Sequence, residues 1–152
     1  VAKVAPQHLV VVLGNQREIA ALYYSTAVVM RMQGQLLLAL DYSRLAQAAF
    51  EQMGDRGFLA LALYEQSRVY ALQGETAAAV VAGEQSCALF RVLEDRFGIV
   101  YVLNHLGSLQ MELGDRGAAR GVWQEGLAIA EPLAHPLVGL LRQRLAEVGL
   151  RN

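Results

Sequence analysis

The chain has 152 residues, of which 55% are hydrophobic and 18% are charged, and its formal net charge is −1. These values predict one globular domain with a sizeable core and exclude a disordered chain. The near-neutral charge, with no run of Lys or Arg, argues against direct nucleic-acid binding. The apolar runs fall far short of the roughly 20 residues of a membrane span, so we expect no membrane contact. The single cysteine, Cys87, fits a cytoplasmic protein because it cannot form an internal disulfide.

A 40-residue repeat organises the sequence. Gly34, Gly74 and Gly114 lie 40 residues apart, and each closes a stretch with the apolar spacing of a helix. Further positions keep their character at the same spacing: Ala27, Ser67 and Gly107; Ala39, Ala79 and Ala119; Ala46, Ser86 and Gly126; Phe50 and Phe90. So many matches at one spacing indicate a repeat protein.

The segments between these positions predict helices throughout. Ala and Leu dominate them, and the three Pro residues lie near expected helix ends. In chain order we expect the end of a preceding repeat at 1–13, three repeats of two helices each at 15–53, 55–93 and 95–133, and a C-terminal capping helix at 136–149. The fold class is therefore all-α, with essentially no β-strand and with helix breaks near residues 14, 34, 54, 74, 94, 114 and 134.

The tetrapeptide Gly-Asp-Arg-Gly occurs twice, at 54–57 and at 114–117. The separation of 60 residues is one and a half periods, so one copy joins two repeats and the other turns within a repeat. Gly can end a helix in the left-handed conformation, and a following Asp favours the next helix N-terminus. A phosphate-binding loop would need more glycines after a β-strand, so we interpret both copies as turns.

The third repeat resembles the tetratricopeptide repeat (TPR). The segment "LNHLGSLQMELGDRGAARGVWQEGLAIA" carries the family's pattern at Leu106, Gly107, Gly114, Asp115, Ala119 and Trp123. The other two repeats depart from it, with Gly83 and Ser43 at the position of Trp123. The 40-residue period is similar to that of the helical arrays in bacterial signalling ATPases and transcription regulators. This resemblance implies a right-handed α-solenoid of helix-turn-helix repeats.

Nothing in the sequence predicts a catalyst. It contains no metalloprotease, nucleophile-elbow or Walker-type motif, and its His and acidic residues are scattered, so we expect no enzyme, cofactor or metal site. His105 is more easily explained as a partly exposed polar residue than as a base, and Trp123 as core. Cys87 fits a small buried hydrophobic residue.

The inner wall of the array is the expected place of function. In such arrays the first helices of successive repeats line a concave groove, and residues three or four apart share a helix face. The candidate peptide- or ligand-binding residues are Tyr24, Arg31, Tyr64, Arg68, Tyr101, Asn104, His105 and Ser108. Tyr, Arg and Asn together are typical of a peptide-binding surface. Tyr64 or Tyr101 could instead fill the seam between helices.

The expected function is non-catalytic binding of a protein or peptide segment, as a sensor or scaffold of a larger bacterial regulator. The alternative is a metabolite-sensing domain of a signalling ATPase or transcription regulator. The apolar residues Leu9–Leu13 belong to a helix whose partner is missing. We therefore expect the N-terminal edge either to self-associate or to be covered by a rearranged terminus.

Overall fold

The computed structural model describes residues 15–150, and within them it contains only helices, turns and loops. The helices are α2 (Gln16–Met32), α3 (Leu36–Met53), α4 (Arg56–Leu72), α5 (Thr76–Val92), α6 (Arg96–Glu112), α7 (Arg116–Ala130) and α8 (Val138–Leu150). The predicted breaks at 34, 54, 74, 94, 114 and 134 are confirmed. The break at 14 and the expected helix end at 1–13 lie outside the described residues. Across residues 15–150, no helix has the length and apolar character needed to cross a membrane.

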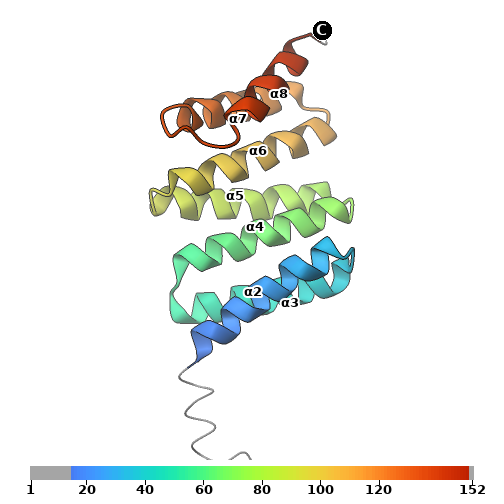
Figure 1. The fold of residues 1–152 in the computed structure, drawn as a ribbon. Helices are drawn as coiled ribbons and strands as arrows, with labels where there is room; N and C mark the ends of the chain where they lie inside the picture. Colours follow the sequence, from blue (N-terminus) through green and yellow to red (C-terminus); the bar gives the residue numbers. More distant parts are fainter. Residues whose placement is uncertain (1–14, 151–152) are drawn as a thin grey trace, which may run out of the picture.

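The helices stack as an all-α solenoid-like array (Figure 1). Each helix packs against the next one in the chain, and α2 also contacts α4. Figure 1 shows the pairs as successive layers, from α2 and α3 at one end to α7 and α8 at the other. A helix therefore meets mainly its neighbours in sequence, as the repeat predicts.

The turns have the chemistry that the sequence predicts. Gly34, Gly54, Gly74 and Gly114 all have positive φ, between 69° and 80°. The backbone N–H after each glycine donates to a carbonyl in the last turn of the preceding helix, which satisfies a group that a helix end leaves unpaired. Both copies of Gly-Asp-Arg-Gly are such turns. Two further turns of this type place a non-glycine residue in the left-handed region, Glu94 at φ 55° and Ala134 at φ 48°.

Only the aspartates act as side-chain caps. The carboxylates of Asp55, Asp95 and Asp115 accept hydrogen bonds from backbone N–H groups three residues later, at 2.9–3.2 Å. Gln35 and Glu75 make no such bond at the corresponding turns. The longer side chains cannot fold back onto the first turn as an Asp does, and they favour the helix N-terminus at most through its dipole.

The repeated spacing of small residues lets the helices approach closely. Gly107 lies under Trp123, so closely that an added Cβ would stand 2.1 Å from the indole Nε1. Two buried hydroxyls bond to carbonyls of neighbouring helices: Ser67 to Ala79 at 2.5 Å, and Ser86 to Ala60 at 2.6 Å. The small residues thus let the buried rings of Phe50, Phe90 and Trp123 pack between helices, and Leu, Val and Ile side chains fill the rest of the core. This confirms the expectation that Trp123 is a core residue.

The last helix, α8, is only partly the solvent-facing cap that the sequence predicts. Leu141 and Val148 pack into the core beside Trp123, and Arg142 is exposed and pairs with Glu131. Arg144, by contrast, is half-buried and turns toward α6, where it donates to the Ser108 hydroxyl. Residue 144 is 40 positions after Asn104, so α8 takes the place of a further first helix.

Candidate functional site

The candidate residues lie on α2, α4 and α6, the first helices of the three repeats. Tyr24, Tyr64, Asn104 and Ser108 are half-buried, and Tyr101 is 39% exposed. None of these side chains is fully exposed to solvent. The face that they form is therefore packed, but its polar atoms and aromatic rings still reach the surface. The site is built from three neighbouring groups of contacts.

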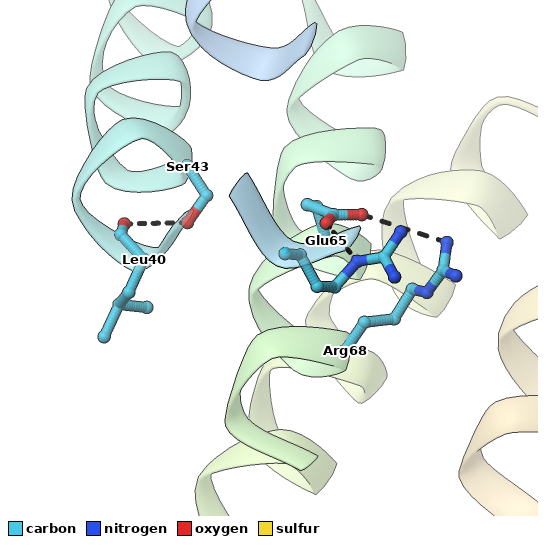
Figure 2. A network of polar contacts seen from close by, with 5 residues as sticks. Leu40, Ser43, Glu65 and Arg68 are labelled. Carbon is cyan, nitrogen blue, oxygen red and sulfur yellow. Dashed lines mark hydrogen bonds and ion pairs between the residues drawn. The ribbon is translucent and has the colours of Figure 1, made fainter. Parts of the chain in front are cut away.

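The first group centres on Glu65, which sequence analysis did not select. Its side chain is almost fully buried, and its Oε1 lies 2.5 Å from the Nε of Arg31 on α2. Its Oε2 lies 3.9 Å from the guanidinium of Arg68, one turn further along α4. Figure 2 shows the Glu65 carboxylate with its ion-pair contact to Arg68. Glu65 therefore ties α2 to α4 and fixes both arginines.

A signal for Glu65 was present in the sequence. Ser25, Glu65 and His105 are 40 residues apart and are all polar, next to the column that contains Tyr24, Tyr64 and Asn104. A polar residue at the same position of the repeat in three helices indicates that this face of the helices is not a purely apolar part of the core. The burial of Glu65 was harder to predict, because Ser25 at the equivalent position is exposed.

The second group joins Tyr64, Arg68 and His105. The Arg68 guanidinium lies 5.5 Å from the centre of the Tyr64 ring, within the range of a cation–π contact. The His105 ring meets Tyr64 edge-on, with centroids 5.7 Å apart. Burial raises the pKa of the Tyr64 phenol, and burial also raises that of Tyr24, with Glu65 as the next cause for Tyr24. Both phenols thus remain neutral donors at physiological pH.

His105 is fixed by Ser67. The Ser67 hydroxyl donates its proton to the Ala79 carbonyl, so it accepts a hydrogen bond from Nε2 of His105 at 2.9 Å. This assigns the Nε2–H tautomer and leaves Nδ1 as the acceptor. Burial is the main cause that lowers the pKa of His105 to about 4, and the positive charges of Arg68 and Arg144 contribute to the same shift. The Ser67 hydroxyl is fully buried, so this Ser–His pair cannot act as a nucleophile and base.

The third group contains Asn104, Ser108 and Arg144. The Asn104 carbonyl accepts from the Trp123 indole N–H at 3.1 Å, and its side-chain Oδ1 is buried without a hydrogen-bond partner. The Arg144 guanidinium lies 5.3 Å from the centre of the Trp123 ring and donates to Ser108. Sequence analysis missed Arg144 because it treated the last helix as a cap. The sequence did point to Arg144, because it stands one 40-residue period after Asn104.

Tyr101 was expected to share a patch with Asn104 and Ser108, but its ring contacts lie elsewhere. The Tyr101 ring packs edge-on against buried His135, with centroids 4.7 Å apart, and Phe97 covers the same imidazole at 4.6 Å. The His135 Nδ1 accepts from the Leu137 backbone N–H at 3.1 Å. Burial lowers the pKa of His135. Tyr101 therefore partly fills a seam beside its helix. Sequence analysis gave this as the alternative to exposure in the groove.

A cavity of about 280 Å³ opens between α4 and α6, beside these groups. Its polar lining comes from Arg31, Arg68, His105, Ser108 and Glu112, and its apolar lining includes Leu72 and Leu109. Four of the eight predicted site residues thus line one cavity. The arrangement can present fixed positive charge and hydrogen-bond donors to a ligand.

Within residues 15–150, no three His, Cys, Asp or Glu side chains are grouped so that they could hold a metal ion. Cys87 is buried, and burial raises the pKa of its thiol. A scan against protein-family models and a search of curated proteins found no match to this chain.

Proposed function

We propose that the chain is a non-catalytic binding module that holds a protein or peptide segment along the face of α2, α4, α6 and α8. The observation that carries this proposal is the cluster of Tyr64, Arg68, His105 and Ser108 beside an open cavity. Before any ligand arrives, Arg68 is held by Glu65 and Tyr64, His105 by Ser67, and Ser108 by Asn104 and Arg144. Pre-organised Tyr and Arg side chains lower the ordering cost of binding and commonly dominate it.

Each group has a role in this proposal. Arg68 is 40% exposed and would pair with a carboxylate of the partner. Tyr24 and Tyr64 would contribute flat apolar area with a polar tip. Tyr101 and its neighbour Phe97 are exposed enough to extend this area along α6. A role as the sensor or scaffold of a larger cytoplasmic bacterial regulator, as in TPR-type arrays, follows from the resemblance of the third repeat.

A peptide-display library provides a direct test, because no partner need be known. Peptides selected on the purified chain should share a motif, and the affinity of a selected peptide is then measured by calorimetry. We expect Arg68→Ala to weaken binding by about 2 kcal/mol. The matched control is Arg142→Ala, an exposed arginine of α8 that pairs with Glu131 away from the cavity. Equal losses for both variants, with helicity unchanged, would refute the groove assignment.

Metabolite sensing is the second candidate, and the compact cavity favours it specifically. An open cavity of about 280 Å³, lined by two arginines, a histidine, a serine and a glutamate, could hold a small polar molecule. The affinity for a metabolite should depend on Arg68 and His105 alone. The affinity for a peptide should also fall in the Tyr24→Ala variant. A panel of metabolites in a thermal-shift assay, repeated with these three variants, separates the two functions.

A further inference from the structure

His135 joins three helices through the α7–α8 connection (residues 131–137). Its backbone N–H donates to the Ala130 carbonyl at the end of α7, at 3.1 Å, and its own carbonyl accepts from the Val138 N–H at the start of α8, also at 3.1 Å. Its ring Nδ1 accepts from the Leu137 N–H at 3.1 Å. His135 therefore satisfies two backbone donors at the start of α8, where a helix leaves such groups unpaired.

The ring of His135 is held against α6 by two aromatic side chains. The Phe97 and Tyr101 rings lie 4.6 and 4.7 Å from it between centroids, and His135 is only 2% exposed. Because Nδ1 accepts a hydrogen bond, the neutral ring carries its proton on Nε2, which has no hydrogen-bond partner among residues 15–150. The preceding residue, Ala134, has φ 48°, which is unfavourable for a residue with a side chain. A neutral imidazole in an apolar site thus holds a connection whose own backbone is strained.

A second proton on this ring would oppose every one of these contacts. With both ring nitrogens protonated, Nδ1 can no longer accept from the Leu137 N–H. The charge would be buried between two rings, and it would stand at the N-terminus of α8, where the helix dipole disfavours a cation. Burial accordingly lowers the pKa of His135, although the Phe97 backbone opposes part of this shift.

The groups around His135 do not compensate such a charge. Tyr101 is the titratable residue whose ring faces it from α6. Glu131 of the connection and Arg142 of α8 are exposed and pair with each other at 3.0 Å. Within the described part of the chain, no charged side chain contributes to the pKa of His135. Among residues 131–137, His135 is also the one residue of a type that changes charge between pH 5 and 8.

We propose that His135 is a pH-sensitive latch, and that a proton on Nδ1 releases the α7–α8 connection and the first turn of α8 from α6. The release is local, because Leu145 and Val148 pack into the core further along α8. Phe97 and Tyr101, at one end of the proposed binding face, lose their contact with the imidazole at the same time. The latch acts in the protein alone and does not depend on the proposed binding role.

Hydrogen exchange of the backbone amides, followed by NMR on the whole chain between pH 7.5 and 5, measures the latch. The reporters are Val138 and Leu141, whose N–H groups bond to the carbonyls of His135 and Leu137. The released ring takes up a proton at its ordinary pKa of about 6.5. After correction for the intrinsic pH dependence of exchange, we therefore expect protection at both reporters to fall about tenfold for each pH unit below 6.5, down to the pKa of His135 in the folded chain. Amides of α4, in another layer of the stack (Figure 1), should stay protected.

Two variants locate the titrating group. In His135→Asn the side chain can still accept from a backbone N–H at the start of α8 but cannot gain a proton, so protection at the reporters should not change with pH. The matched control is His105→Gln, which removes a histidine that lies against Ser67 and Tyr64. It should keep the full fall in protection. In the wild type, the ring resonances of His135 should titrate over the pH range in which protection falls, and this measurement needs no variant.

A local fall in protection that follows the titration of His135 and is absent in His135→Asn supports the latch. Equal protection at pH 7.5 and pH 5 overturns it, as does an equal fall in the wild type and in His135→Asn. A parallel loss of protection in α4 would mean unfolding of the whole chain and would also overturn a local release. If His105→Gln removes the fall, the pH dependence belongs to His105 and the latch is wrong.

Discussion

Three residues at one register of the repeat show how differently the same position can be used. Ser25 is exposed and its hydroxyl bonds to the Ala21 carbonyl of its own helix. Glu65 is buried in an ion pair, and His105 is half-buried and bonded to Ser67. The first helix of each repeat places all three on one face. What packs against that face decides whether the side chain is solvated or buried.

Burial determines how much an ion pair of given geometry stabilises the fold. The N–O distance is 2.5 Å both in the buried Arg31–Glu65 pair and in the exposed Arg91–Glu125 pair. Glu65→Gln leaves the Arg31 charge buried without its partner, so we expect a loss of about 3 kcal/mol in the free energy of unfolding. Glu125→Gln should cost less than about 1 kcal/mol. Urea unfolding of both variants measures the difference, and similar losses would contradict the role of burial.

Buried His135 and half-buried His105 make stability depend on pH. Both have a lower pKa in the folded chain than the usual 6.5, and that of His105 is about 4. The unfolded chain binds more protons between these values, so folding is most stable above pH 6.5 and loses stability as the pH falls toward 4. For His105 alone the full loss is about 3 kcal/mol. Urea unfolding at a series of pH values should show His105→Gln with a flatter profile. If the profile of His105→Gln is as steep as that of the wild type, His105 is not a source of the pH dependence of stability.

At the scale of helices, glycine has two different uses outside the turns. Gly107 of α6 leaves room for the indole of Trp123, whereas Gly121 of α7 is exposed and has nothing within 4 Å of its Cβ position. The same residue type is thus a packing requirement in one helix and a source of backbone freedom in the next. Only the contacts between helices distinguish them.

Replacing each of these glycines by alanine tests this difference. Gly107→Ala would place a methyl group 2.1 Å from Trp123 Nε1 and displace the ring from its bond to Asn104, so we expect a loss of about 3 kcal/mol. Gly121→Ala should raise stability by about 0.5–1 kcal/mol, because alanine favours the helix and meets no neighbour. Thermal unfolding gives both values. A neutral Gly107→Ala would mean that α6 and α7 can separate at little cost.

At the scale of the whole molecule, the first described helix exposes a face that its equivalents bury. Leu22 is 64% exposed and Val29 is 46% exposed, whereas Ala62 and Val69, one period later, are fully buried. Figure 1 shows α2 at one end of the stack, and no described element covers its outer side. The sequence placed the edge that would self-associate or be covered by a rearranged terminus at Leu9–Leu13, which lie outside the described residues; the exposed face of α2 follows them in the chain.

We expect a second copy of the chain to cover this edge, because the exposed positions are apolar and their equivalents are core. Light scattering over a wide concentration range should show self-association of the whole chain. The double change Leu22→Ser and Val29→Ser should abolish it with little loss of helicity. Val81→Ser, at an exposed valine of α5, is the control and should change nothing. A wild-type chain that stays monomeric at all concentrations contradicts the expectation.

Much of the fold followed from the sequence by itself. The 40-residue period, the helices and their breaks depend on local chemistry: helix-forming residues, glycines with positive φ, and aspartates that cap the next helix. In a solenoid each helix packs mainly on its sequence neighbours, so a local pattern is nearly sufficient to determine the array. The candidate face was predictable for the same reason, since register places Tyr64, Arg68 and His105 together.

The tertiary structure alone decided how those side chains are held. Glu65 is buried because Arg31 of another helix meets it, and Arg144 turns into the groove because Trp123 and Ser108 offer it a ring and a hydroxyl. Tyr101 packs against His135, which lies in the loop before α8. These contacts join residues 21 to 36 positions apart on different elements. Their energies depend on desolvation and distance in three dimensions, which no periodicity in the sequence encodes.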